Sequence, residues 1–321
     1  MNSIIVASEK PKTGKTMVGS VLCSYLQSKN VKVGAISSLF DPQDSESVIP
    51  NWLKDIEVIP GMLGKAPKKA SSDLIGRAGL EIKKLSKNSL ITESHLKTLE
   101  ENKELAESSG SRIVYVCDKD SDISKIKEVL GPSLLGIVIN NVPRYQIESL
   151  KISLQDSNPI LGFIPENRYM VSSTVDQYAN HMKGKYLYES ERKNDLILNV
   201  LIGGIVLDWS VLYYKSKQNV LAIIRGDRPD LHLGAMQSGT VNALMLTKAI
   251  EPIEYVYYEA KKLEIPIISV ETDTHETANL VEGIVEKSVF DHPEKLNKMV
   301  IEFEKNMNFD LVSNLLETST P

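Results

Sequence analysis

The chain has 321 residues, a length that favours two domains, each able to bury a core. Hydrophobic residues make up 42% and charged residues 25% of the sequence, which excludes a disordered or collagen-like chain. The 42 acidic and 37 basic residues give a net charge of −5, so we expect no nucleic-acid partner, for which a basic excess is normal.

In the first half of the chain, short apolar runs alternate with amphipathic stretches, the pattern of a parallel sheet wrapped by helices. The first run, residues 4–7, precedes a turn and a helical pattern over residues 17–26. The other predicted strands are residues 31–36, 89–92, 112–117, 134–139 and 159–164. Polar stretches at residues 97–108 and 121–130 fit surface helices.

The most specific motif is the turn at residues 8–16, Ser-Glu-Lys-Pro-Lys-Thr-Gly-Lys-Thr, between a predicted strand and a predicted helix. Free N–H groups and the helix dipole attract phosphate at such a helix start. Gly14 allows close backbone approach, Lys15 can reach the β- and γ-phosphates, and the Thr16 hydroxyl can ligate Mg²⁺. We therefore predict an ATP site formed by Lys10, Thr13, Gly14, Lys15, Thr16 and Met17.

Glu9 stands where the strict phosphate-loop pattern has its first glycine, and the alternative is a chance Gly-Lys-Thr at a helix start. If the loop binds ATP, Lys15 and Lys12 are the candidate catalytic residues, because they would stabilise charge on the phosphates. Lys10 lies five residues before Lys15, where one branch of these loops has a second lysine that reaches across a dimer in some members. A solvated loop charge is the other interpretation of Lys10.

The loop resembles the dethiobiotin-synthetase-like branch of P-loop proteins, whose loops also tolerate a missing first glycine. Residues 136–143, Gly-Ile-Val-Ile-Asn-Asn-Val-Pro, are similar to the strand and turn in which that family's asparagine, here Asn140, reads adenine. Residues 161–165, Leu-Gly-Phe-Ile-Pro, resemble the next strand, where Pro165 would line the base. The resemblance implies that residues 1–166 form a P-loop ATP-binding domain.

The same resemblance suggests metal ligands. Glu93, at the end of a predicted strand, matches the family's metal-associated acid; a solvent-exposed carboxylate is the alternative. Asp41, and after it Asp44, follow the second strand and could hold Mg²⁺ through water, although a helix cap or turn aspartate explains either residue equally well. Ser37-Ser38 stands where the family usually has Lys-Pro, which argues against dethiobiotin synthesis but leaves nucleotide binding intact.

The pattern changes near residue 165, where we expect a second, smaller α/β domain over residues 167–290 and a helical tail over residues 291–321. Residues 183–195 are polar and typical of a loop. The most hydrophobic window, residues 196–209, is shorter than the ~18–20 residues of a transmembrane helix, and a buried strand explains it better. The predicted strands are residues 202–206, 220–224, 243–246 and 265–270.

Residues 168–290 resemble the DRTGG domain, a module found beside nucleotide-binding and phosphotransacetylase-like proteins. The resemblance rests on Gly-Asp-Arg-Pro-Asp at 226–230, Ser-Gly-Thr at 238–240, Leu-Thr at 246–247 and Thr-Asp-Thr at 272–274. Lys248-Ala249 stands where a glycine pair is common, which questions a pocket that needs close backbone approach.

The second domain contains a cluster of charged residues near its first motif. Asp227, Arg228 and Asp230 could bind a small anion, but an ion-pair network that shapes the turn is favoured. His232 and His275 have no other His or Cys at ligand spacing, so turn or surface positions are expected for them.

Both resemblances together match the N-terminal architecture of phosphotransacetylase-like proteins, but the stretch after residue 290 is too short for their acyltransferase domain, so we expect no acetyl-phosphate chemistry. The function that fits best is a Mg-ATP-binding P-loop protein with weak ATPase or phosphoryl-transfer activity, coupled to a regulatory, dimerising DRTGG domain. The alternatives are a non-catalytic nucleotide sensor and an ATP-dependent, carboxylate-activating ligase.

The cellular context follows from the remaining signals. We expect a cytoplasmic homodimer without membrane association, because the N-terminus lacks a targeting pattern and the dimer is implied by the family. Cys23 and Cys117 are too few for a disulfide framework or a zinc cluster, which indicates a reducing compartment. The second substrate or small-molecule ligand is not indicated by the sequence.

Overall fold

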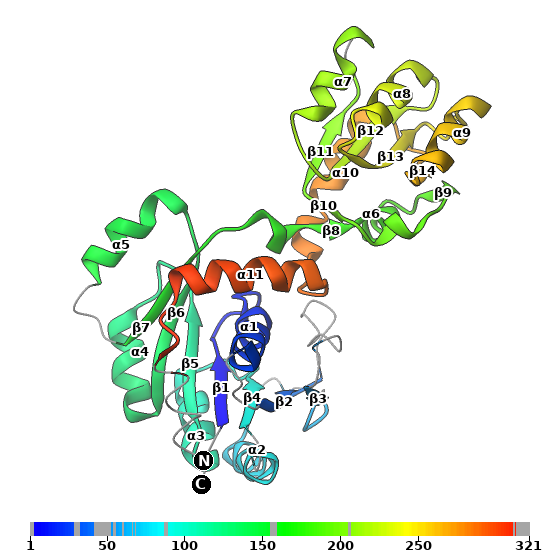
Figure 1. Cartoon of the computed structure of the whole chain (residues 1–321). Coiled ribbons are helices and arrows are strands. Elements are labelled where there is room, and N and C mark those ends of the chain that lie inside the picture. Colours follow the sequence, from blue (N-terminus) through cyan, green and yellow to red (C-terminus); the bar gives the residue numbers. More distant parts are fainter. Residues whose placement is uncertain are drawn as a thin grey trace. The chain divides into compact units, whose positions relative to one another are not determined.

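The chain folds into two compact units (Figure 1). The first combines Met1–Asn167 with Val289–Pro321, and the second is Arg168–Ser288. The computed structural model describes residues 3–28, 33–41, 53, 56–59, 61–65, 67, 69–86, 89–154, 159–204, 207–310 and 312.

In the described part of the first unit, seven parallel strands form one sheet in the order β3-β2-β4-β1-β5-β6-β7. These strands are β1 (Ser3–Ala7), β2 (Val33–Ser38), β3 (Glu57–Ile59), β4 (Ser89–Glu93), β5 (Arg112–Cys117), β6 (Leu134–Val142) and β7 (Ile160–Pro165). The chain runs outward from β1 to β2, returns to β4 and then crosses to β5. The segments that follow β1, β4 and β5 therefore lie together at the carboxyl edge of the sheet.

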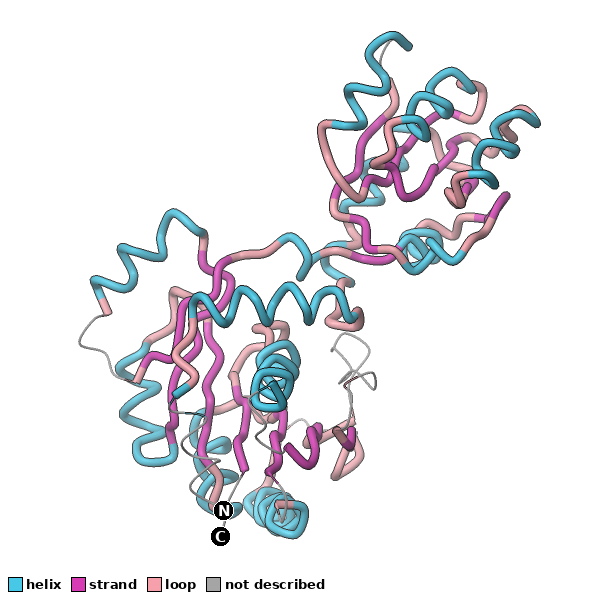
Figure 2. The backbone as a smooth tube through the Cα atoms, viewed as in Figure 1, coloured by secondary structure: helices cyan, strands magenta, loops and turns pink. Residues whose placement is uncertain are grey.

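Helices cover both faces of this sheet (Figure 2). They are α1 (Lys15–Ser28), α2 (Ser72–Leu85), α3 (Leu99–Ser109), α4 (Ile123–Leu130), α5 (Ile147–Ser153) and α11 (Pro293–Asn306). Gly19 of α1 lies against Val6, Ile36 and Ile91 on one face. The alternate strand residues, such as Ile5 and Leu90, pack with α2, α3 and α4 on the other face. The predicted α/β fold with a mostly parallel sheet and helices on both faces is confirmed.

The helices of the first unit begin and end at recognisable signals. Thr98 and Glu101 form a reciprocal capping box at the start of α3, and Gly110 ends the helix in the left-handed conformation with φ 71°. Ser71 caps α2 by accepting a hydrogen bond from the amide of Leu74. Short 3₁₀ helices occupy Gly131–Ser133, Arg144–Gln146, Arg168–Val171, Glu191–Asn194 and Val285–Lys287 across both units.

The end of the chain belongs to the first unit. The helix α11 packs against α1 and β7, and the residues after it continue along the edge strand β7. The amide of Asn308 donates to the carbonyl of Leu161 at 2.7 Å, and the Phe309 ring stacks on Tyr25 with ring centres 3.7 Å apart. The segment that we expected to be a separate helical tail therefore completes the first core.

The second unit has its own mixed sheet in the order β11-β12-β13-β14-β9, in which β9 is antiparallel to β14. The strands of this unit are β8 (Ser173–Thr174), β9 (Lys185–Tyr188), β10 (Leu196–Ile197), β11 (Asn199–Ile202), β12 (Val220–Arg225), β13 (Val241–Thr247) and β14 (Ile267–Ser269). Strands β8 and β10 form a separate antiparallel pair.

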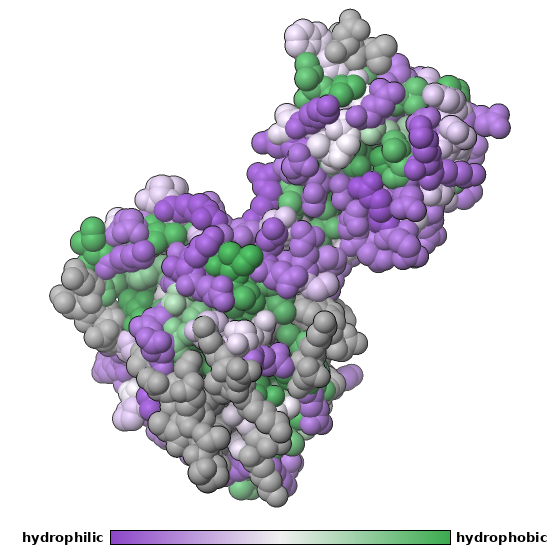
Figure 3. Space-filling view, viewed as in Figure 1, coloured by the Kyte–Doolittle hydropathy of each residue, from purple (hydrophilic) through white to green (hydrophobic). Residues whose placement is uncertain are grey.

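Helices also cover both faces of the second sheet. They are α6 (Val175–His181), α7 (Leu207–Lys215), α8 (Pro229–Gln237), α9 (Glu254–Lys262) and α10 (Thr274–Glu282). One buried cluster joins α7, α8 and α9 to the sheet, and a second cluster joins α6 and α10 to its other face. In the view of Figure 3, hydrophilic residues cover most of this unit, with hydrophobic patches between them.

Two predictions for the second unit were wrong. The polar stretch at residues 183–195 contains β9, an edge strand whose half-exposed residues carry no apolar run. The strand expected at residues 202–206 is β11, which ends at Ile202 and begins three residues earlier. Residues 205 and 206 lie outside the described part of the chain, as do residues 31 and 32 of the predicted second strand.

Candidate functional site

The phosphate-loop motif lies between β1 and α1. Lys12 and Gly14 have left-handed backbone φ values of 57° and 99°. A side chain at Gly14 would place its Cβ 2.5 Å from Nδ2 of Asn140, so the position requires glycine. That same Nδ2 donates to the carbonyl of Thr13 at 2.8 Å. Asn140, from β6, therefore lies against the loop; its predicted contact with adenine stays a prediction.

The Lys15 side chain is turned back over the loop. Its Nζ donates to the carbonyl of Lys10 at 3.5 Å, and the residue is 8% exposed. The amide of Val18 donates to the carbonyl of Gly14 at 2.9 Å, which begins the helical hydrogen bonding of α1. The loop thus presents an ammonium group beside the start of a helix, a favourable place for a phosphate.

Thr16 and Glu93 are brought together by neighbouring strands. The Thr16 hydroxyl lies 2.8 Å from Oε2 and 3.0 Å from Oε1 of Glu93, and each residue is 6% exposed. Glu93 is the last residue of β4, which pairs with β1. The hydroxyl donates to the carboxylate, so two oxygen ligands suited to Mg²⁺ meet at the residue that follows Lys15.

His95, which the sequence analysis did not consider, also lies here, together with Ser38, which it considered only in place of the family's Lys-Pro. His95 Nε2 is 3.7 Å from Oε1 of Glu93, and its Nδ1 is 3.4 Å from Oγ of Ser38. Ser38 ends β2 and donates to the carbonyl of Phe40 at 2.6 Å. The sequence offers one signal for these two residues, which is that Ser38 and His95 each follow a predicted strand by no more than a few residues.

Asp41 is placed differently from Thr16 and Glu93. It is exposed, and its carboxylate lies over Gly61, where a Cβ would come 1.7 Å from Oδ1. Among the residues that the structure describes, Asp41 forms no hydrogen bond or ion pair with Thr16 or Glu93. The structure therefore does not bring all three predicted metal ligands together. Asp44 lies outside the described residues.

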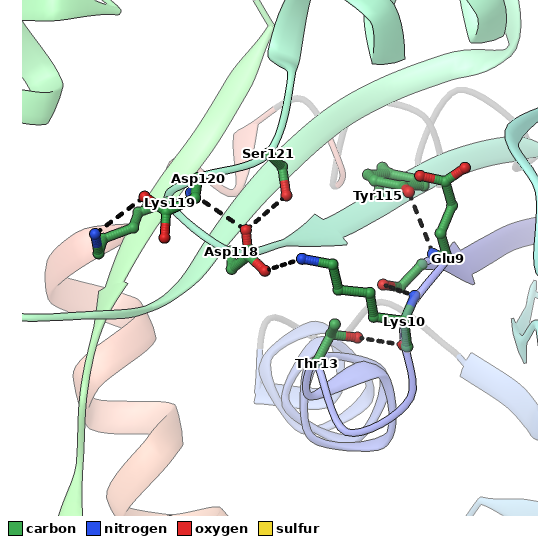
Figure 4. A network of polar contacts seen from close by, with 9 residues as sticks. Glu9, Lys10, Thr13, Tyr115, Asp118, Lys119, Asp120 and Ser121 are labelled. Atoms are coloured by element: carbon green, nitrogen blue, oxygen red, sulfur yellow. Dashed lines mark hydrogen bonds and ion pairs between the residues drawn. The ribbon is translucent and has the colours of Figure 1, made fainter.

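Lys10 forms an ion pair within the same chain (Figure 4). Its Nζ is 2.5 Å from Oδ2 of Asp118, which follows β5. The contact raises the pKa of Lys10 and lowers the pKa of Asp118, because each charge favours the other. Asp118 also accepts from the Ser121 hydroxyl at 2.8 Å and from the amide of Asp120 at 3.2 Å. Asp118 was missed, although it directly follows a predicted strand.

Glu9, at the position of the missing glycine, is exposed and lies beside Tyr115 (Figure 4). Its amide donates to the Tyr115 hydroxyl at 3.2 Å. Burial, and secondly the Glu9 carboxylate, raise the pKa of Tyr115. Of the other predicted nucleotide ligands, Lys12 is exposed, while Met17 and Pro165 are buried.

In the second unit, the predicted charged residues form two local pairs. Arg228 donates through Nε and Nη2 to Asp230 at 2.9 and 2.7 Å, and Arg225 pairs in the same way with Asp227. The neighbouring arginines lower the pKa of both aspartates. Arg225, which ends β12, was not singled out from the sequence.

The prediction of a turn or surface position was wrong for His232. This residue is fully buried on α8, because its ring packs beneath the end of β12 and lies 2.8 Å from the carbonyl of Arg225. Burial lowers the pKa of His232. His275, on α10, is exposed as expected.

Within the described ranges, no group of three or more His, Cys, Asp or Glu side chains could hold a metal ion. None of the helices traced in those ranges combines the length and the apolar character needed to cross a membrane.

Curated relatives match part of the chain. A phosphate acetyltransferase of Nitratidesulfovibrio vulgaris is 26% identical over 172 residues, and one of Synechocystis sp. is 22% identical over 197 residues. These matches cover 50% and 58% of this chain but only 24% and 28% of the relatives. The chain thus spans about a quarter of the length of the curated relatives it matches.

Two solved structures are similar to part of the chain at low sequence identity. The septum site-determining protein MinD of Pyrococcus horikoshii, complexed with Mg-ADP, is 18% identical with a TM-score of 0.37, covering 53% of this chain and 83% of that one. The CBS and DRTGG domains of the regulatory region of Clostridium perfringens pyrophosphatase are 13% identical with a TM-score of 0.33, covering 49% of this chain and 83% of that one.

Two family models match successive parts of the sequence. The model described as the DRTGG domain matches residues 177–284, which lie in the second unit. The model described as the CobQ/CobB/MinD/ParA nucleotide binding domain matches residues 4–175, more than half of the chain, and includes the loop, Thr16 and Glu93. With a nucleotide-binding domain followed by a DRTGG domain, the chain belongs to the CobQ/CobB/MinD/ParA nucleotide-binding family.

Proposed function

We propose that the first unit binds Mg-ATP at the loop between β1 and α1 and turns it over slowly, and that the second unit regulates this activity. The observation that carries the proposal is the contact between the Thr16 hydroxyl, on the residue that follows Lys15 in the loop motif, and the buried Glu93 carboxylate. A phosphate-binding loop, a metal-binding hydroxyl and an acid therefore lie at the carboxyl edge of the sheet.

The donor chemistry of this site fits Mg²⁺. Thr16 and Glu93 offer only oxygen ligands, and Mg²⁺ is commonly held by one or two such groups, with water and substrate phosphates completing its shell. Bound Mg²⁺ would neutralise charge on the phosphate oxygens. Asp41 enters the proposal only as a ligand that acts through water, because its carboxylate lies over Gly61.

The roles of the loop lysines follow from their surroundings. Lys15, whose Nζ now lies on the Lys10 carbonyl, would exchange that neutral partner for a phosphate oxygen. Lys12 is exposed on the loop and would add positive charge at its rim. We assign slow turnover because these groups position and stabilise the phosphates. The Glu93 carboxylate, for its part, accepts a hydrogen bond from the Thr16 hydroxyl.

The finer likeness to dethiobiotin-synthetase-like proteins is part of this proposal. It is supported by Asn140, the residue that the resemblance assigns to adenine recognition, because its amide lies against the loop and donates to Thr13. Pro165, on the neighbouring strand β7, is in register with Val142 of β6. Both candidate base contacts therefore lie on adjacent strands.

Calorimetry on the Lys15→Ala variant tests the proposal. We expect Mg-ATP affinity to fall at least ~100-fold, because a charge-assisted contact with the phosphates is lost from a partly buried site. The control is Lys125→Ala, which removes an exposed lysine from α4 and should leave the affinity unchanged. Equal affinity in the wild type and in Lys15→Ala would exclude this loop as the ATP site.

A nucleotide sensor is the second candidate. It is favoured by the second unit, because the charged residues there form local ion pairs and not a catalytic arrangement. These pairs are Arg225 with Asp227 and Arg228 with Asp230. Steady-state phosphate release separates the two functions. Release that rises linearly with protein and disappears in Lys15→Ala supports an ATPase, whereas ATP binding without release supports a sensor.

We also propose a homodimer. Trp209 and Leu212 on α7 are 66% and 60% exposed, an uncommon position for two large apolar side chains one turn apart. Light scattering at micromolar protein measures the assembly directly, and a stable monomer would contradict the proposal.

A further inference from the structure

A row of polar side chains leads from the end of β2 to the Thr16 hydroxyl. Oγ of Ser38 lies 3.4 Å from Nδ1 of His95, and Nε2 of the same ring lies 3.7 Å from Oε1 of Glu93. Glu93 in turn accepts from the Thr16 hydroxyl at 2.8 Å. The side chains of His95 and Glu93 are only 5% and 8% exposed, so solvent and salt screen their contact little.

The direction of these contacts follows from the groups at the two ends of the row. The carbonyl of Phe40 can only accept, so the Ser38 hydroxyl, 2.6 Å away, gives its single proton to it. The lone pairs of Ser38 are then left to accept from Nδ1 of His95. The Glu93 carboxylate also only accepts, so Nε2 faces it as a donor. The imidazole ring therefore lies between two acceptor oxygens.

The backbone on either side of His95 is held by further hydrogen bonds. The amide of Ser94 donates to the carbonyl of Val6 at 2.9 Å, which ties this segment to β1. The Ser94 hydroxyl donates to Oδ1 of the fully buried Asn102 at 2.6 Å, and Nδ2 of Asn102 donates to the carbonyl of Leu96 at 3.3 Å. The segment that carries the ring therefore has little freedom to move.

The contact with Glu93 decides where the Thr16 hydroxyl can point. Its single proton goes to the carboxylate, so its lone pairs are directed away from Glu93. Metal ions are bound by lone pairs, and groups that hold a metal ligand in place raise the affinity of a site for its metal. A carboxylate with a single hydrogen bond could turn, whereas His95 gives Glu93 a second contact.

We propose that His95 is a positioning residue of the ATP site. It holds the Glu93 carboxylate, and through it the Thr16 hydroxyl, in the orientation that binds Mg²⁺. This inference rests on the proposed function, because it requires Mg-ATP at the loop. In this assignment His95 touches neither the metal nor the phosphates, so it acts on the binding of Mg²⁺ and not on the binding of the nucleotide alone.

Calorimetry on the full chain with a non-hydrolysable ATP analogue tests the role of His95. We expect His95→Ala to raise the Mg²⁺ concentration needed for half-maximal binding roughly 10–100-fold, the usual effect of removing a group that orients a metal ligand. The affinity for the analogue without metal, measured with a chelator present, should stay at the wild-type value. A damaged fold would lower both affinities, so the comparison separates positioning from folding.

Three further variants make the test specific. His95→Gln keeps a side-chain amide that can donate to the carboxylate, so it should recover part of the Mg²⁺ affinity. Ser38→Ala removes only the acceptor on the other side of the ring, and we expect a smaller effect in the same direction. The control is His275→Ala, which removes an exposed histidine of α10 and should behave like the wild type.

The outcomes distinguish failure of this inference from failure of the proposed function. A wild-type chain that does not bind the analogue contradicts the proposed function itself. If the wild type binds and Lys15→Ala does not, the ATP site stands and the role of His95 is judged separately. That role is overturned if His95→Ala keeps the wild-type Mg²⁺ dependence, if it weakens binding equally with and without Mg²⁺, or if His95→Gln recovers nothing.

Discussion

Lys248 and Ala249 follow β13 with left-handed backbone, at φ 68° and 51°. The amide of Lys248 donates to the carbonyl of Thr272 at 2.9 Å and that of Ala249 to the carbonyl of Val270 at 2.8 Å, which holds both residues in this conformation. The resemblance noted in the sequence implies a glycine pair here, and its absence questioned a pocket that needs close backbone approach. The backbone itself has the left-handed conformation that glycine adopts readily.

This strain leads to a stability prediction. Left-handed backbone costs a non-glycine residue ~1–2 kcal/mol, and the extra freedom of glycine in the unfolded chain offsets ~0.4–1 kcal/mol of that gain. We expect Lys248→Gly to stabilise the second unit by about 0.5–1 kcal/mol in denaturant unfolding. Lys261→Gly, at an exposed position inside α9, should instead destabilise it by ~1 kcal/mol. A loss of stability in Lys248→Gly would show that the turn is not strained.

Single residues of the first site were only partly predictable. Lys15 and Thr16 stand out because a short motif between a strand and a helix has a chemical meaning by itself. His95 and Asp118 have no such motif, and their roles arise because β1 lies between β4 and β5. Which strand ends are neighbours is a property of the sheet order, and sequence order alone does not contain it.

Strands buried on both faces were the most predictable elements. Strand β5 has the predicted bounds, because a continuous apolar run is visible in the sequence. Strand β3 and helix α2 were missed; β3 is short and partly exposed, and α2 follows a stretch without a clear pattern. The apolar face of α11 was visible, but the surface that it covers was not, since amphipathicity does not identify a partner.

Gly162 tests the contact of the last segment with β7. A Cβ there would come 2.4 Å from the carbonyl oxygen of Asn306 and 2.8 Å from Cα of Met307, both backbone atoms. We expect Gly162→Ala to destabilise the first unit by ~1–3 kcal/mol, because the packed backbone must shift. Gly76→Ala is the control: its Cβ meets nothing within 4 Å inside α2, so it should stabilise by up to ~1 kcal/mol. Equal effects in denaturant unfolding would show that the segment does not pack on β7.

At the scale of the whole molecule, the second unit is an insertion between Asn167 and Val289 of the first. The chain leaves the nucleotide-binding unit after β7 and returns to it with α11. The sequence suggests two successive domains and a tail, because no local pattern indicates that the chain returns to the first unit. The two family matches also follow one another along the chain.

The return of the chain predicts an unequal response to truncation. A chain that ends at Ser288 lacks Met299, Phe303 and Phe309, whose side chains are at most 5% exposed in the first unit. Because each buried apolar side chain contributes ~1.5–3 kcal/mol, we expect the first unit to lose several kcal/mol of stability and its ATP affinity with it.

The second unit is the internal control for this truncation. Hydrogen exchange measured by mass spectrometry follows each unit separately, through the buried strand β5 in the first and the buried strand β13 in the second. Truncation should raise the exchange rate of the β5 amides and leave that of the β13 amides unchanged. If the β13 amides exchange faster instead, the C-terminal segment supports the second unit, and the assignment of residues 289–321 to the nucleotide-binding unit is wrong.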